Sequence, residues 1–132
     1  APLIPTEKGV SLLIDCGANV DARPSHLVQF ARMGSIYMEH VIGIKKPRVA
    51  IVNIGAEEEK GNALVKETFP LLKEQTDINF TGSIEARNIP YGDADVIVSE
   101  KQANFNVFCV KTEIFGEYAL IAFRENASKC RK

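Results

Sequence analysis

The chain has 132 residues, which is enough for one domain with a buried core and too few for two ordinary domains. Sixteen basic and seventeen acidic side chains give a formal charge of −1, so the chain lacks the basic excess that nucleic-acid binding usually requires. No apolar run approaches the roughly 20 residues of a membrane span, and no signal-peptide pattern opens the sequence. These features favour a globular cytoplasmic protein with no nucleic-acid partner.

The three cysteines Cys16, Cys109 and Cys130 are widely spaced and odd in number. This pattern is neither a disulfide framework nor a zinc ligand set, and it favours a reducing compartment. The chain begins without Met, directly in Ala1–Pro5, which is typical of a piece cut from a longer protein.

The first part of the chain predicts a loop and then a buried strand. Residues 1–9 contain proline and are expected to form a lead-in loop. Val10–Asp15 is a continuous apolar run with a polar end, which is typical of a strand covered on both faces. The glycine-containing segment Gly17–Asp21 follows as a loop.

A helix is predicted from about residue 24 to residue 42. Pro24 suits its first turn, and Ser25 or Asp21 is expected to cap it. Gly43 ends it. The apolar residues at helical spacing are Leu27, Phe30, Ala31, Gly34, Tyr37, Met38, Val41 and Ile42, and the two small ones among them favour a close approach to a sheet.

A second strand and a second helix are predicted at Val49–Asn53 and Ala63–Glu74. Pro70 lies inside that helix at a cost of roughly 3 kcal/mol, so a kink or a break is expected there. The residues expected to face inward are Leu64, Val65, Thr68, Leu71 and Leu72.

The remaining elements complete an alternating pattern. Strands are predicted at Asp77–Thr81 and Asp95–Val98, with a short helical piece at Ile84–Ile89. Gln102–Arg124 fits either a long helix or a partly extended segment. Alternating strands and helices favour an α/β fold in three layers, with a mostly parallel sheet covered by helices on both faces.

Ligands bind to open α/β sheets where the carboxyl ends of strands meet the amino ends of helices. The sequence predicts three such junctions, which follow Asp15, lie at Asn53–Gly55 and lie at Thr81–Gly82. We expect the functional site at these junctions.

Several long motifs in this chain resemble those of the PlsX family, the phosphate acyltransferases of bacterial phospholipid synthesis. The motifs are Leu13–Tyr37, Pro47–Gly55, Glu58–Asn62, Ile78–Gly82, Ile84–Arg87 and Gly92–Val98, in the family's order and spacing. The resemblance covers roughly residues 1–99.

The resemblance implies a fold similar to the isocitrate/isopropylmalate dehydrogenases. It also implies transfer of a long acyl group from acyl carrier protein to inorganic phosphate, which gives acyl phosphate. Such an enzyme is implied to work as a homodimer in peripheral contact with the cytoplasmic face of the membrane. No cofactor or metal is implied, and the nucleotide-binding glycine fingerprints are missing from the sequence.

The chain departs from the family pattern in length and after Val98. Whole family members are well over twice as long, so we expect a central fragment: one α/β domain over residues 1–132 with a family-like core over 1–99. The family's Asp-Gly-Phe-x-Gly-Asn turn is replaced by Ser99–Asn106, which has no glycine. Residues 100–132 are therefore expected to be divergent.

The first junction offers Gly17, Asn19 and Asp21 to a substrate phosphate. A helix amino end supplies backbone N–H donors and a favourable dipole for an anion. The Asp21 carboxylate repels phosphate, so its expected task is to cap the helix or to orient Asn19. The alternative is a structural turn whose polar groups satisfy only the backbone.

The second junction offers Lys60, Gly61 and Asn62. Lys60 is expected to meet phosphate as a point charge, while Gly61 and Asn62 begin a helix whose N–H groups face the ligand. The neighbouring run Glu57–Glu59 is interpreted as a solvated loop.

Arg87 fits a bidentate anion ligand, and equally a surface ion pair with Glu85 or Asp93. His26 is the candidate general acid toward the leaving thiolate, because its unperturbed pKa lies near neutrality. The alternative for His26 is a solvent-facing helix histidine.

Two further features have simpler interpretations. Cys16 suits a nucleophile that takes the acyl group, but an inert buried thiol fits its position after an apolar strand better. The basic turn with Lys45, Lys46 and Arg48 suits either docking of the acidic acyl carrier protein or plain solvation.

We therefore predict a phosphate acyltransferase fragment that uses acyl carrier protein and inorganic phosphate. One alternative is a phosphotransacetylase-like enzyme that uses coenzyme A thioesters. Another is a non-catalytic binding or scaffold fragment of the same fold.

Overall fold

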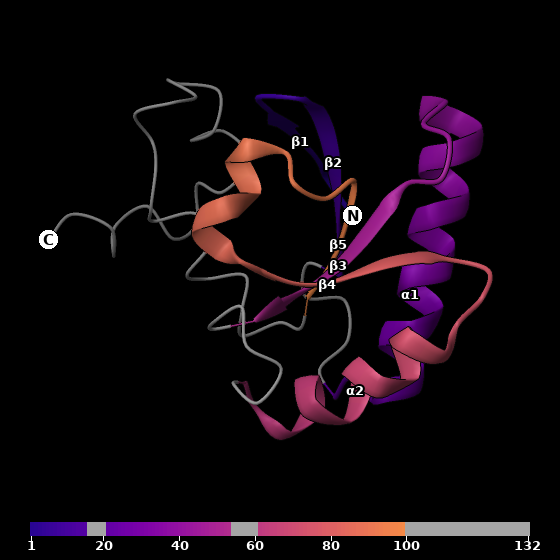
Figure 1. Ribbon diagram of the computed structural model, residues 1–132, viewed down its shortest axis with the longest axis vertical. Helices are drawn as coiled ribbons and strands as arrows, with labels where there is room; N and C mark the ends of the chain where they lie inside the picture. The colour runs from indigo at the N-terminus through magenta and orange to yellow at the C-terminus, as the bar shows by residue number, and fades with distance from the viewer. Residues whose placement is uncertain (16–20, 54–60, 100–132) are drawn as a thin grey trace, which may run out of the picture.

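The computed structural model of the protein describes residues 1–15, 21–53 and 61–99 (Figure 1). Its strands are β1 (Leu3–Thr6), β2 (Gly9–Ile14), β3 (Arg48–Asn53), β4 (Asn79–Glu85) and β5 (Val96–Val98). Its helices are α1 (Pro24–Tyr37) and α2 (Ala63–Glu74), with a π turn, η1 (Met38–Ile42), and a 3₁₀ segment, η2 (Ala86–Tyr91). The predictions for Cys16, Gly17, Asn19, Lys60 and Gln102–Arg124 lie outside the described residues.

The strands form one five-stranded sheet in the order β1-β2-β5-β3-β4. Strand β5 pairs in parallel with both β2 and β3, and β4 pairs in parallel with β3. Only β1 is antiparallel among the described strands, and it pairs with β2 at one edge. The predicted α/β fold with a mostly parallel sheet is therefore confirmed.

Both faces of the sheet are buried, as the continuous apolar runs indicate. On one face, alternate strand residues such as Leu12, Ile51 and Val96 pack with α1 and α2. On the other face, their neighbours Leu13 and Ile97 pack in a cluster that includes residues of η2. Figure 1 shows α1 and η2 on opposite sides of the strands.

Helix α1 lies very close to the sheet because Gly34 faces β5. A Cβ atom at Gly34 would lie 2.6 Å from Val96 Cγ1, so glycine is needed for this packing distance. The close approach predicted from Ala31 and Gly34 is confirmed, and both residues are buried. An ion pair of 2.9 Å between Arg32 Nε and Asp77 Oδ2 ties α1 to the segment that follows α2.

Residues 1–9 are not the loop that the prolines suggested, because Leu3–Thr6 forms β1. Pro5 lies opposite Val10 on an edge strand, where its missing N–H costs little. Proline content is therefore compatible with this strand, although it would not be in the centre of the sheet.

Thr81–Gly82 is not the strand–helix junction that was predicted, since β4 continues through it to Glu85. The register with β3 shifts here: Val49 pairs with Phe80 and Ala50 pairs with Gly82. Thr81 is the extra residue of this bulge, and its hydroxyl donates to the Val49 carbonyl at 3.1 Å. Gly82 has φ of 111°, a conformation that favours glycine.

The apolar stripe predicted for residues 24–42 is only partly correct, although Met38 and Ile42 in its second half do pack on the core. The α-helix ends at Tyr37, and the wider π turn η1 follows before Gly43 ends the segment with φ of 86°. Tyr37 and Val41 are exposed rather than buried, whereas Met38 between them is completely buried.

Helix α2 has the predicted bounds and continues through Pro70, so the expected break is wrong. Val65, Thr68 and Leu72 are buried as predicted, whereas Leu71 is exposed and Phe69 takes an inward position. The Phe69 ring packs edge-on against Phe80 of β4 with 5.2 Å between centroids. None of the described helices is long and apolar enough to cross a membrane.

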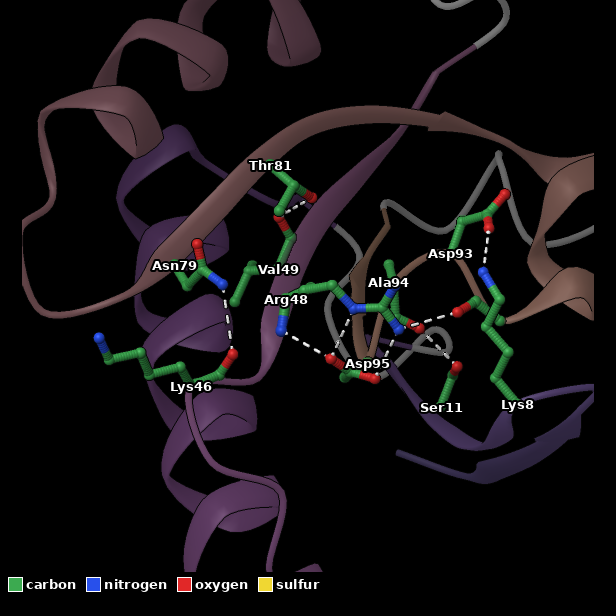
Figure 2. Close-up of polar contacts among 11 residues, drawn as sticks. Lys8, Ser11, Lys46, Arg48, Val49, Asn79, Thr81, Asp93, Ala94 and Asp95 are labelled. Atoms are coloured by element: carbon green, nitrogen blue, oxygen red, sulfur yellow. Dashed lines mark hydrogen bonds and ion pairs between the residues drawn. The ribbon is translucent and has the colours of Figure 1, made fainter.

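The amino edge of the sheet is held by a bidentate pair between Arg48 and Asp95 (Figure 2). Nε and Nη2 of Arg48 donate to the two carboxylate oxygens at 3.0 Å each, and the Arg48 backbone N–H donates to Oδ2 at 2.8 Å. Nη2 also donates to the Gly92 carbonyl at 2.9 Å. Burial alone would raise the pKa of Asp95, but the bonds from Arg48 outweigh it and hold that pKa below its usual value.

Replacement of Asp95 by Asn tests this pair. Because the carboxylate is largely buried and makes charge-assisted bonds, we expect Asp95→Asn to lower the free energy of unfolding by about 2 kcal/mol at neutral pH. A lowered folded-state pKa stabilises the fold above the unfolded-state pKa of about 3.9 and is lost as pH falls through the folded value. The difference between variant and wild type should therefore shrink in acid.

Asp93→Asn is the matched control for this urea-denaturation series. Asp93 pairs with Lys8 at 2.9 Å, but both side chains are more than half exposed, so its loss should change little. Equal destabilisation by the two variants, or a gap that persists in acid, would contradict the account.

Candidate functional site

The carboxyl ends of the parallel strands carry a row of polar residues. Asp15 follows β2, Ser99 follows β5, Asn53 ends β3 and Glu85 ends β4. Neighbouring strands lie about 4.8 Å apart, so the row crosses one edge of the sheet. The Asp15 N–H donates to the Ser99 carbonyl at 3.3 Å, and Asn53 lies in register with Glu85.

Helix α1 begins at this edge with a cap that the sequence analysis did not predict. Arg23 is the N-cap residue, and His26 Nδ1 accepts a hydrogen bond from the Arg23 backbone N–H at 3.2 Å. The histidine therefore takes the role that Glu or Gln plays in a capping box. The expectation that Ser25 or Asp21 caps the helix is wrong, while Pro24 occupies the first helical position as predicted.

The cap fixes the orientation of the His26 imidazole. Because Nδ1 accepts a hydrogen bond, the neutral ring carries its proton on Nε2. The side chain is half-buried rather than freely solvated. In this orientation Nε2 is the ring atom with a proton to donate.

Helix α2 begins at the same edge with Asn62 as its N-cap. Asn62 Oδ1 accepts from the Val65 N–H at 2.9 Å, which satisfies one of the free amide groups of the first turn. The remaining amides of that turn supply the donors that an anion requires. Asn62 therefore shapes the amino end of α2, as the sequence analysis expected of a residue that begins a helix.

Gly61 brings the start of α2 against the end of β3. Its φ is 127°, and a Cβ atom there would lie 2.6 Å from Asn53 Oδ1 and 3.3 Å from Val65 Cβ. Both the backbone conformation and the space exclude a side chain. Gly61 is thus required for packing, whether or not its amide binds a ligand.

Arg87 forms the ion pair with Glu85 that was one of its two predicted roles. Its Nε lies 2.7 Å from Glu85 Oε2, and Asp93 pairs with Lys8 instead. The Arg87 side chain is two-thirds exposed, whereas only a fifth of Glu85 is exposed. Glu85 therefore holds the guanidinium at the carboxyl edge of the sheet.

The structure places most of the described candidates at one edge. His26 lies in the first turn of α1, Asp21 precedes that helix, and Gly61 and Asn62 begin α2. Strand β5 lies between the two strands that lead to these helices. Gly17, Asn19 and Lys60 lie outside the described residues.

The basic turn lies at the opposite edge. Lys45 and Lys46 precede the amino end of β3, and the six residues of that strand span roughly 20 Å. The Arg48 guanidinium is bound by Asp95, so it is not a docking group for an acidic partner. The turn is therefore remote from the candidate site.

Within residues 1–15, 21–53 and 61–99, no group of three or more His, Cys, Asp or Glu side chains is placed to hold a metal ion. The donors at the carboxyl edge are backbone amides, amide side chains and a guanidinium, which suit an oxyanion better than a cation.

Sequence reasoning placed a junction at Asn53–Gly55 but gave the Asn53 side chain no role. Asn53 ends an apolar strand and is only 5% exposed, although its side chain is polar. A polar residue at the end of a buried strand, followed later by a glycine just before a helix, was the signal that would have identified the pair of Asn53 and Gly61.

A family model described as "Fatty acid synthesis protein" matches residues 1–130 of the chain. The chain is similar to the phosphate acyltransferase of Clostridium beijerinckii, with 53% identity over 100 residues, 76% of this chain and 30% of that protein. A phosphate acyltransferase of Bacillus licheniformis is 56% identical over 101 residues, again 76% and 30%. The phosphate acyltransferase of Elusimicrobium minutum is 55% identical over 100 residues, which are 76% of this chain and 29% of that protein.

These curated relatives are much longer than the aligned segment. The chain spans about 30% of the length of the curated relatives it matches. Their similarity is therefore evidence about one part of a larger protein.

Two substitutions at Asn62 separate helix capping from ligand binding. Asn62→Ala should lower the free energy of unfolding by about 1 kcal/mol, because the Val65 N–H loses its acceptor. Asn62→Asp should keep the stability, since aspartate caps equally well, but its charge should weaken the binding of an anion at this edge. Thermal unfolding and a titration with inorganic phosphate measure the two effects, and weakened binding by Ala alone would contradict this division.

Proposed function

The chain belongs to the fatty acid synthesis protein family, and from this premise we propose that it is the part of a phosphate acyltransferase that binds inorganic phosphate. The observation that carries the proposal is the identity of 53–56% to proteins named phosphate acyltransferase. It agrees with the resemblance that the sequence motifs indicated. The chain covers a third or less of those proteins, so the reaction belongs to the longer protein.

The geometry supports a phosphate site at the carboxyl edge. The first turns of α1 and α2 both begin there, each with the positive end of its helix dipole. In α1 the N–H groups of His26 and Leu27 donate to the Arg23 carbonyl at 3.0 and 3.3 Å, so the Ser25 N–H is the donor proposed from that turn, beside those of Ala63 and Leu64 in α2. A small tetraoxyanion requires several donors from more than one direction, and two helix ends supply them. Arg87 adds a guanidinium at the end of β4.

In the proposed reaction a phosphate oxygen attacks the carbonyl carbon of a fatty acyl thioester carried by acyl carrier protein. A carbon–oxygen bond forms, the carbon–sulfur bond breaks, and the carrier thiolate leaves and takes up a proton. The products are acyl phosphate and the carrier thiol. Catalysis then rests on positioning and on donors for the developing oxyanion, without a covalent enzyme intermediate.

Each candidate residue has a proposed role. The proposed phosphate ligands are Gly17, Asn19, Lys60, Gly61, Asn62 and Arg87. Asp21 orients Asn19, since it does not cap α1. His26 is the proposed general acid toward the leaving thiolate, a role that requires the imidazolium, whose Nδ1 no longer accepts the Arg23 N–H. In the neutral, capped form its Nε2–H donates a hydrogen bond to the leaving sulfur.

The proposal extends to the fold and the assembly of the longer protein. We assign the α/β sheet to a three-layer fold similar to the isocitrate/isopropylmalate dehydrogenases. The longer enzyme works as a homodimer in the cytoplasm, in peripheral contact with the inner face of the cell membrane. Two alternatives to this proposed function are a phosphotransacetylase-like enzyme that uses coenzyme A thioesters and a non-catalytic fragment or scaffold.

Mass spectrometry of reaction products tests this function. Incubation of the longer protein that contains this chain with fatty acyl carrier protein and inorganic phosphate should give acyl phosphate, with the C. beijerinckii relative as a positive control. Product from the coenzyme A thioester alone would favour the phosphotransacetylase-like enzyme. A folded chain with no product from either thioester would favour the non-catalytic fragment.

Two lysine variants test the site within that assay. Lys60→Ala should raise the KM for phosphate roughly tenfold or more, since it removes a charged ligand. Lys45→Ala removes the same charge at the opposite edge of the sheet and should leave that KM unchanged. Equal effects of the two variants would show that only net charge matters and would refute the placement.

A further inference from the structure

Asn53 is a polar residue in a buried position at the end of an apolar strand. It follows the apolar residues of β3 and is only 5% exposed. The carboxamide takes part in a polar interaction that offsets the cost of its burial, and this fixes its orientation in a way that an apolar side chain would not be fixed. The amide is therefore expected to serve a purpose beyond core packing.

The side chain of Asn53 contacts the start of α2. A Cβ atom added to Gly61 would lie only 2.6 Å from Asn53 Oδ1 and 3.3 Å from Asn53 Cγ. Gly61 immediately precedes Asn62, the N-cap of α2. The carboxamide thus fills the space between the end of β3 and the backbone that opens the helix.

The Asn62 cap and the Asn53 contact have different consequences. The bond from the Val65 N–H to Asn62 decides where along the chain α2 begins. The contact between Asn53 and Gly61 decides where that beginning lies relative to the sheet. Interiors are close-packed, so a shift of either residue displaces the other.

We propose that Asn53 is a positioning residue, which seats the first turn of α2 on the carboxyl end of β3 so that its amides hold the substrate phosphate. This rests on the proposed function. Asn53 acts through Gly61 and does not itself touch phosphate. Its partner in register is Glu85, which holds Arg87, so the same strand ends align both anion-binding elements.

The kinetic experiment uses the longer protein that contains these 132 residues, as wild type, four single variants and one double variant. Asn53→Ala removes the carboxamide, and Gly61→Ala inserts a methyl group against it. Each has a matched control at the opposite edge. Ser11→Ala removes a buried hydroxyl that donates to the Ala94 carbonyl at 2.6 Å. Gly92→Ala adds a methyl group at a glycine with φ of 74°, 2.7 Å from Thr6 Oγ1.

Both site variants should raise the KM for phosphate about tenfold, because small misplacements of positioned groups are costly. The KM for the acyl thioester should stay within twofold of wild type. The two controls should lower the melting temperature by a similar amount without a change in either KM. The double variant Asn53→Ala with Gly61→Ala should cost less than the sum of the single effects, since the first makes room for the second.

Amide hydrogen exchange provides a readout that needs no catalysis. Exchange at Ala63, Leu64 and Val65 should be faster in Asn53→Ala than in Ser11→Ala at matched stability. Faster exchange in Asn53→Ala, combined with a wild-type protein that forms no acyl phosphate, would refute the proposed function. It would still support the role of Asn53 in positioning α2. An unchanged phosphate KM in an active Asn53→Ala variant would overturn the inference and leave the function standing. Exchange at these amides that matches the Ser11→Ala control would also overturn it.

Discussion

The parallel pairing of β5 with both β2 and β3 is the constraint on which the rest of the structure depends. Val96, Ile97 and Val98 are completely buried, and they join two strands that are separated in the sequence by helix α1. Because all three strands run in the same direction, their carboxyl ends meet at one edge of the sheet. The helices that follow β2 and β3 therefore start at that edge. Gly34 adds to this arrangement, since it allows α1 to lie directly on Val96.

The two edges of the sheet have different chemistry. The amino edge holds the bidentate pair of Arg48 and Asp95, whose groups bind one another and stabilise the strands (Figure 2). The carboxyl edge holds polar groups that arrange helix starts: His26 caps α1, and Asn53 packs against Gly61. Interactions that stabilise the fold and groups that suit an anion are thus separated by the length of the strands. Substitutions at one edge can alter stability while the other edge keeps its geometry.

The sequence was informative where one physical rule dominated. Buried parallel strands require continuous apolar runs, so β2, β3 and β5 were predictable, and helical spacing gave the bounds of α2. Prediction from the sequence failed where one residue type is compatible with two different local structures. Proline marks loops but also fits edge strands, as in β1, and glycine marks turns but also bulges, as in β4. The candidate residues at the helix starts were proposed from junction chemistry. The sequence placed Asn53 at a junction but could not show its contact with Gly61, because that contact depends on the folded arrangement of two elements.

A titration of the isotopically labelled chain with inorganic phosphate, followed by NMR of the backbone amides, tests the central claim most directly. That claim is that the starts of α1 and α2 act together on one anion. The account predicts that the amides of Ser25–Leu27 and of Ala63–Val65 shift with a single common dissociation constant. Shifts confined to one helix start, or gathered instead around Lys45 and Lys46 at the opposite edge, would contradict it.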